Sequence, residues 1–161
     1  MNVKHFGFDF EEYSSADQLA EEDRLLLQEA RNATQNAYAP YSKFLVGAAA
    51  LLMNNEIVTG SNQENASFPA GICAERALLA SLAQLFPNVA VKTMAVTYNN
   101  LKGNSDTPAS PCGFCRQVMA EYELRTNTPM RLLLAGSTGS VYVISSISML
   151  LPLTFQLNVI E

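Results

Sequence analysis

Three cysteines are the residues of this chain best suited to chemistry. They are Cys73, Cys112 and Cys115, and they are the only cysteines among 161 residues. Three thiols cannot all pair with one another, so metal binding or catalysis has to be considered. A structural zinc site normally has four protein ligands, and the only histidine is His5, near the N-terminus. The sequence therefore raises the question of the fourth ligand.

Cys112 and Cys115 stand three residues apart in PCGFC, which places both sulfurs on one side of the first turn of a helix. Taken alone, this spacing fits a redox pair, a zinc site or no site at all. A redox pair leaves Cys73 unexplained. Cys73 lies in CAE, two residues before Glu75, at the start of a stretch rich in Ala and Leu that is predicted to be helical.

Residues i and i+2 do not share a helix face, so a site that uses both Cys73 and Glu75 must lie off the helix N-terminus. Cys112 and Cys115 open another predicted helix, and two partly positive helix N-termini would stabilise an anionic trithiolate zinc centre. Three protein ligands leave the fourth tetrahedral position to water, which is the catalytic pattern. The sequence predicts one Zn²⁺ per chain, with Glu75 free to carry protons. Arg76 could hydrogen-bond one or two thiolates, or lie on a solvated helix face.

The elements that must position these residues follow from hydrophobic periodicity and turn residues. A helix is predicted over Ser15–Tyr38, with Ser15 or Asp17 as its N-cap, and a strand hairpin over Phe44–Met53 and Glu56–Asn62. There follow a helix over Cys73–Phe86, a strand over Val89–Tyr98, a loop over Asn99–Pro111, a helix from near Cys112 to about Arg125, strands over Met130–Gly136 and Ser140–Ser145, and a helical turn over Ser146–Pro152. This order predicts one α/β domain over residues 1–161, a three-layer α/β/α sandwich around a mixed sheet of about five strands.

Charge and composition exclude several kinds of partner. A net charge of -5 and a pI of about 4.9 disfavour a nucleic-acid partner, whose phosphates attract Lys and Arg. The longest apolar stretch, Phe44–Met53, is half the length of about 20 residues that crosses a bilayer. The N-terminus has no apolar signal region, so we expect a cytoplasmic protein. The acidic run Glu11–Asp23 is predicted to be a solvated entrance to the first helix.

The motifs together resemble a known family. The pairing of CAE (73–75) with PCGFC (111–115) is similar to the zinc-dependent cytidine deaminase superfamily, specifically its three-cysteine branch. Four blocks occur in the order found in small homotetrameric cytidine deaminases: AYAPYSKFLVGAA (37–49), SNQENASFPAGICAER (61–76), ASPCGFCRQVMAE (109–121) and LLPLTF (150–155). The resemblance covers most of the chain, and it implies that the three cysteines bind zinc and that Glu75 is the proton shuttle.

The resemblance also implies a nucleoside site. Asn62 and Glu64 match an N-x-E pair that holds the ribose hydroxyls, although Glu64 has the alternative of an exposed loop carboxylate. Phe44 matches an aromatic residue that packs against the nucleoside, or it packs in the core. The backbone N–H groups at Ala74 and the helix start are expected to donate to the carbonyl of the base. Phe155 matches a phenylalanine that lies over the base of a neighbouring subunit in a homotetramer, or it folds back onto its own core.

The implied function is hydrolytic deamination of cytidine and deoxycytidine to uridine and deoxyuridine plus ammonia, in pyrimidine salvage, with Glu75 serving a zinc-bound hydroxide. One alternative is a deaminase of another cytosine compound, such as the blasticidin type, which has no use for a ribose-binding Asn62 and Glu64. Another is a non-catalytic zinc-stabilised interaction module, which needs a fourth protein ligand, His5 or a carboxylate. The tail Gln156–Glu161 differs from the acidic Asp-Leu tail of relatives and is given no role.

Overall fold

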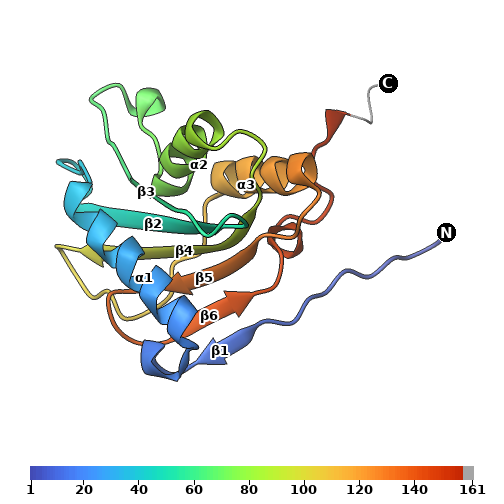
Figure 1. Ribbon diagram of the computed structural model, residues 1–161, viewed down its shortest axis with the longest axis horizontal. Helices are drawn as coiled ribbons and strands as arrows, with labels where there is room; N and C mark the ends of the chain where they lie inside the picture. The colour runs from blue at the N-terminus through green and yellow to red at the C-terminus, as the bar shows by residue number, and fades with distance from the viewer. Residues whose placement is uncertain (158–161) are drawn as a thin grey trace.

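A computed structural model describes residues 1–157 and shows one mixed sheet with helices on both faces (Figure 1). Its strands lie in the order β1-β6-β5-β4-β2-β3. Neighbouring strands are antiparallel except β4 and β5, which are parallel. The elements are β1 (Glu11–Tyr13), α1 (Glu21–Ala33), β2 (Phe44–Leu52), β3 (Ile57–Ser61), α2 (Ala74–Leu85), β4 (Val91–Asn100), α3 (Gly113–Thr126), β5 (Arg131–Ala135) and β6 (Val141–Ile144).

The sheet separates two hydrophobic cores. Successive residues of β2 point to opposite faces, so Ala49 and Leu51 pack with α1 while Ala48 and Ala50 pack on the side of α2 and α3. A strand that is buried on both faces has a continuous apolar sequence, as the β2 sequence FLVGAAALL does. The predicted three-layer α/β/α sandwich is confirmed.

A glycine in the sheet sets how closely α2 approaches it. A Cβ atom added at Gly60 of β3 would lie 2.7 Å from Ala74 O and from Leu78 N, both in α2. Such a separation is shorter than real Cβ contacts, so only glycine allows this approach without movement of the helix. Gly60 therefore fixes the height of the first turn of α2 above the sheet, and that turn carries Glu75.

The prediction for the N-terminal region was wrong in two respects. Glu11–Tyr13 does not lead into a helix but forms β1, which pairs with β6 and makes the sheet six-stranded instead of about five-stranded. The first helix begins at Glu21 and not near Ser15. The physical reason is that Leu19 and Ala20 have ψ angles of 155° and 153°, which separate the 3₁₀ turn Ala16–Gln18 from α1. Asp23, in the first turn of α1, is 6% exposed and accepts two hydrogen bonds from Arg131 of β5, at 2.6 and 2.7 Å. This contact attaches the start of α1 to the sheet.

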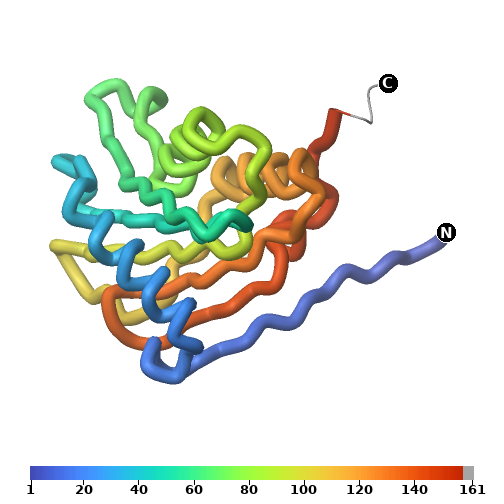
Figure 2. The backbone as a smooth tube through the Cα atoms, in the orientation of Figure 1, coloured from blue at the N-terminus to red at the C-terminus, as the bar shows by residue number. Residues whose placement is uncertain are grey.

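The remaining predicted elements are present with shifted ends. The first helix ends at Ala33 instead of Tyr38, and β4 covers Val91–Asn100 instead of Val89–Tyr98. Figure 2 shows residues 1–10 as an extended arm that leads into β1. Among the described helices, none combines the length and the apolar character that crossing a membrane requires. The end of the tail Gln156–Glu161, residues 158–161, lies outside the described residues.

Candidate active site

The N-termini of α2 and α3 bring the three cysteines together. Cys73 is the N-cap of α2, Cys112 is the N-cap of α3, and Cys115 lies in the first turn of α3. The Sγ atoms of Cys73 and Cys112 are 4.0 Å apart, and those of Cys112 and Cys115 are 3.5 Å apart. All three Sγ atoms lie within 4.8 Å of one another. The N-termini of two helices thus lie close together, as predicted.

The spacing of the sulfurs fits a tetrahedral zinc ion. Zn–S bonds of about 2.3 Å in a tetrahedron separate the sulfurs by about 3.8 Å, which lies between the separations of 3.5 and 4.0 Å in the structure. Thiolates suit zinc as soft ligands, and the unpaired N–H groups at both helix starts favour negative charge. Cys73, Cys112 and Cys115 therefore form a zinc-binding cluster that supplies three protein ligands.

The environment shifts the pKa values of the groups around this cluster. A hydrogen bond from the Cys115 thiol lowers the pKa of Cys73 to about 6, and the same contact raises the pKa of Cys115. Burial raises the pKa of the Glu75 carboxyl, which is in the first turn of α2 and 5% exposed. A buried carboxyl next to the metal cluster is suited to exchanging protons with a molecule held there.

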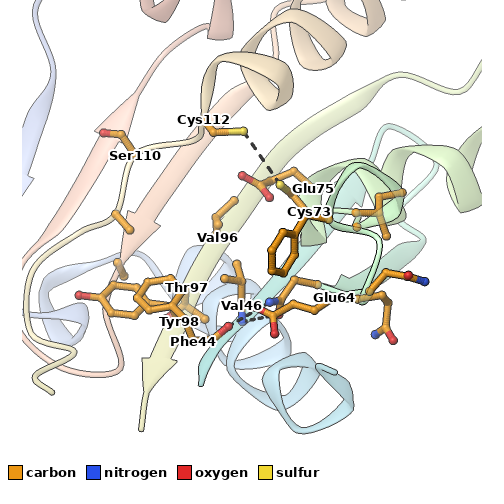
Figure 3. A pocket seen from close by; sticks show the side chains of 18 residues that line it. Phe44, Val46, Glu64, Cys73, Glu75, Val96, Thr97, Tyr98, Ser110 and Cys112 are labelled. Carbon is orange, nitrogen blue, oxygen red and sulfur yellow. Dashed lines mark hydrogen bonds between the residues drawn. The ribbon is translucent and has the colours of Figure 1, made fainter. Parts of the chain in front are cut away.

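A cavity of about 440 Å³ opens in front of the cysteines. In Figure 3, Cys73, Cys112 and Glu75 lie toward one end of this pocket, and Phe44 and Tyr98 lie toward the other. The walls come from β2, β4, the segment between β3 and α2, and the loop before α3. The pocket has the size of those that bind small molecules.

Asn62 lies in the pocket wall and also holds β2. Its Oδ1 accepts a hydrogen bond from the N–H of Val46 at 2.8 Å, and its Nδ2 donates to Phe44 O at 2.9 Å. These two bonds use the amide oxygen and one of the two amide protons, so one N–H remains for a ligand. Asn62 thus supports the strand that presents Phe44 to the pocket.

Glu64 lies in the pocket wall as well, and it accepts hydrogen bonds from two backbone N–H groups. These come from Tyr41 at 2.8 Å and from Ser42 at 3.3 Å. Hydrogen bonding by Ser42 lowers the pKa of the Glu64 carboxyl, which keeps the group ionised. A carboxylate has about four lone-pair sites, so acceptor capacity remains for a hydroxyl group in the pocket.

Phe44 is half-buried in the pocket wall and stacks on Tyr98, with ring centroids 4.5 Å apart. Sequence reasoning singled out Phe44 and missed Tyr98, as well as Phe68, whose side chain is 75% exposed beside the pocket. Tyr98 has the same strand parity as Val96, so alternation along β4 could have placed it on the pocket side. Phe68 lies inside the sequence block SNQENASFPAGICAER (61–76), but nothing in the sequence indicated that this side chain is exposed beside the pocket.

Four predicted site residues, Ala74, Arg76, Cys115 and Phe155, are not among the described residues that line the cavity in front of the cysteines. The Arg76 guanidinium lies over the ring of Phe114, 5.8 Å from its centroid, and the contacts of the described residues include no hydrogen bond from Arg76 to a thiol. Its charge nevertheless contributes to lowering the pKa of Cys73. Phe155 is 63% exposed and lines a separate groove beside α2 and α3. Ala74 is fully buried as the first residue of α2.

The sequence is similar to those of cytidine deaminases. Residues 20–128 match the family model described as "Cytidine and deoxycytidylate deaminase zinc-binding region". A cytidine deaminase of Sporosarcina psychrophila is 37% identical over 131 residues, which are 81% of this chain and 89% of that protein. A cytidine deaminase of Halalkalibacterium halodurans is 40% identical over 98 residues, which are 61% of this chain and 70% of that protein.

The fold has counterparts among solved structures. The crystal structure of cytidine deaminase from Burkholderia pseudomallei superposes with a TM-score of 0.72 at 34% sequence identity. The match covers 85% of this chain and 100% of that chain. Cytidine deaminase from Mycobacterium tuberculosis superposes with a TM-score of 0.64 at 29% identity, over 82% of this chain and 95% of that chain.

Proposed function

Because this chain belongs to the cytidine and deoxycytidylate deaminase zinc-binding family, we propose that its pocket binds cytidine or deoxycytidine and replaces the C4 amino group with oxygen from water. The products are uridine or deoxyuridine and ammonia. The chain is a zinc-dependent cytidine deaminase. The observation that carries the proposal is the cluster of three thiols at two helix N-termini, with the buried Glu75 beside it and a cavity in front of it.

The positions of the side chains support the following chemical roles. Cys73, Cys112 and Cys115 hold the zinc, which when bound supplies a Lewis acid that favours the loss of a proton from water. Glu75 takes that proton on its carboxylate and delivers it to N3 of the pyrimidine. It then takes the remaining proton from the new hydroxyl group at C4 and gives it to the departing amine, which leaves as ammonia. Arg76 adds positive charge near the thiolates, which moderates the negative charge that they bring to the metal.

The pocket wall is proposed to recognise the nucleoside. The free N–H of Asn62 and the carboxylate of Glu64 together can donate to and accept from the ribose hydroxyls, and Phe44 packs against the nucleoside. N–H groups in the first turn of α2 have no intrahelical acceptor, so those that face the pocket can donate to the carbonyl of the base, whereas Ala74, the first residue of α2, is itself fully buried. A blasticidin-type substrate would leave the ribose-binding groups without partners.

The charge of the pocket favours a nucleoside over a nucleotide. The described residues that line the pocket include no Lys, Arg or His, but they include two acidic residues, Glu64 and Glu75. A phosphate would therefore meet two carboxyl groups and no cation, which is unfavourable in a partly enclosed site. For the same reason we exclude polynucleotides from the proposed partners.

We further propose that residues 1–161 form one domain that assembles as a homotetramer with shared active sites. Phe155 is exposed and does not line its own catalytic pocket, which is consistent with a position over the base bound by a neighbouring subunit. The outer side of α3 exposes Phe114 by 77% and Val118 by 37%, and these side chains supply apolar area for subunit contact.

A cytoplasmic location is proposed from the state of the cysteines. All three are free, and a reducing compartment keeps such thiols available to a metal.

The test of the proposed function is direct. The purified protein should contain about one zinc ion per chain and should convert cytidine and deoxycytidine with the absorbance change of uridine formation. Removal of the metal with a chelator should abolish the conversion, and added zinc should restore it. Deoxycytidine 5′-phosphate should react far more slowly than deoxycytidine. Zinc-containing protein without activity on either nucleoside would refute the proposal and favour a zinc-stabilised interaction module.

A further inference from the structure

Tyr98 on β4 connects the aromatic wall of the pocket to the rest of the site. It lies opposite Val46 in the pairing of β2 with β4, so Phe44, two residues before Val46, projects from the same face of the sheet. The rings of Phe44 and Tyr98 are stacked, with centroids 4.5 Å apart and planes inclined by 17° (Figure 3). Such diagonal pairs across two strands are within reach of aromatic side chains.

The hydroxyl group of Tyr98 makes a second connection. It donates a hydrogen bond to Thr107 O at 2.8 Å. Thr107 belongs to the loop between β4 and α3, which continues through Ser110 to Cys112, and both of these residues line the pocket. Tyr98 is only 8% exposed and the bond is partly buried, although Thr107 itself is exposed, so loss of the hydroxyl group would remove a contact between β4 and the loop that water replaces only in part.

We propose that Tyr98 is a positioning residue for the reaction. Its ring covers one face of Phe44 and fixes the orientation of that ring toward the nucleoside. Its hydroxyl group anchors the loop that ends at the zinc ligand Cys112. The first part of the proposal rests on the proposed function, because it requires that Phe44 contacts the substrate. The second part concerns the hold of the protein on zinc and can be measured without substrate.

The first part is tested by a double-mutant cycle with Phe44. Tyr98→Leu should raise KM for cytidine by about 3- to 10-fold, which is the fold-change that corresponds to the interaction free energy of a stacked aromatic pair. The value of kcat should change by less than about two-fold. In the Phe44→Leu background the same change should alter KM by less than about two-fold, because Tyr98 acts through Phe44. An equal increase of KM in both backgrounds would overturn this part, since it would show an effect that is independent of Phe44.

The second part is tested by Tyr98→Phe, which keeps the ring and removes only the hydroxyl group. This variant of the holoenzyme should transfer zinc to a chromogenic chelator about three-fold faster than the wild type, as expected for the loss of one hydrogen bond. Its KM for cytidine should stay within about two-fold of the wild-type value, because the stack with Phe44 remains.

Tyr122→Phe is the matched control for the loss of one partly buried hydrogen bond. The Tyr122 hydroxyl also donates to a backbone carbonyl, Val89 O, at 2.7 Å, but it lies in α3 more than a turn beyond Cys115. This control should lose comparable thermal stability and release zinc at the wild-type rate. Equal zinc release from Tyr98→Phe and wild type, or equal acceleration in both variants, would overturn the loop-anchoring role. If wild-type protein failed to deaminate cytidine, the proposed function would fail, and zinc release would still decide the role of Tyr98.

Discussion

Gly60→Ala should damage both stability and activity, although Gly60 touches neither zinc nor substrate. The added Cβ would lie 2.7 Å from Ala74 O and Leu78 N, whereas ordinary contact begins at 3.4 Å. The clash is with backbone atoms, so α2 must move away from the sheet by about 0.7 Å. Overpacking of this kind costs about 1–3 kcal/mol. For a chain of 161 residues, that cost corresponds to a fall in Tm of about 3–9 °C.

The catalytic effect of Gly60→Ala follows from the same displacement. The first turn of α2 carries Glu75, and Cys73 is its N-cap, so both groups move relative to α3. A misplacement of about 1 Å can cost 10²-fold, so kcat/KM for cytidine should fall by about 10- to 100-fold. Scanning calorimetry and the deamination assay measure the two effects separately.

Gly113→Ala provides the matched control for this substitution. Gly113 is the first residue of α3, next to Cys112, and a Cβ atom placed there has no neighbour within 4 Å. Replacing glycine by alanine at an unstrained helical position stabilises by about 0.4–1 kcal/mol. Gly113→Ala should therefore keep its activity and gain slightly in Tm. Wild-type Tm and activity in Gly60→Ala would refute the reasoning that this glycine sets the position of α2.

Three further substitutions test the proposed roles. Glu75→Gln keeps the side-chain shape but cannot relay protons, so zinc content and Tm should stay unchanged while turnover falls by about 10²-fold or more. Glu64→Ala should impair the reaction of cytidine far more than that of free cytosine, because a site that hydrogen-bonds hydroxyl groups discriminates against molecules without them. Phe155→Ala should lose roughly 1–3 kcal/mol of stacking, a 5- to 150-fold loss in affinity for cytidine. When Phe155→Ala and Glu75→Gln subunits are denatured and reassembled together, activity should rise above that of either variant.

Each of these predictions has an outcome that contradicts it. Near-normal turnover of Glu75→Gln would remove Glu75 from the proton transfers. Equal losses on cytidine and cytosine would mean that Glu64 acts through its hydrogen bonds to Tyr41 and Ser42, and thus on loop structure alone. Absence of recovery in verified mixed tetramers would confine Phe155 to its own subunit.

The metal cluster was predictable because its determinants are local. Pro111 and the Ala-rich stretch after Cys73 mark two helix starts, and residues at a helix start have a known direction relative to the helix axis. For the cysteines at these two helix starts to meet, the two helices only had to lie on the same side of the sheet. The order of helices and strands along the chain already predicted a layered arrangement.

The features that escaped prediction depend on pairs of residues that are distant in sequence. β1 has only three residues and no alternation of buried and exposed side chains, and it lies beside a contact between Asp23 and Arg131 that joins positions 108 apart. The stacking of Tyr98 on Phe44 depends on the register between β2 and β4. Strand parity can assign Tyr98 to a face but cannot identify the ring that it contacts.

The position of the metal cluster also affects how the chain assembles. Cys73 and Cys112 are 39 residues apart and belong to helices that follow different strands, β3 and β4. Zinc therefore closes a long loop. The entropic cost of closing this loop is compensated only when both segments have docked on the sheet. Before that stage the chain offers at most the local pair Cys112 and Cys115 to the ion. The fraction of chains that hold zinc tightly is consequently a measure of completed folding, and the zinc content of a preparation reports it.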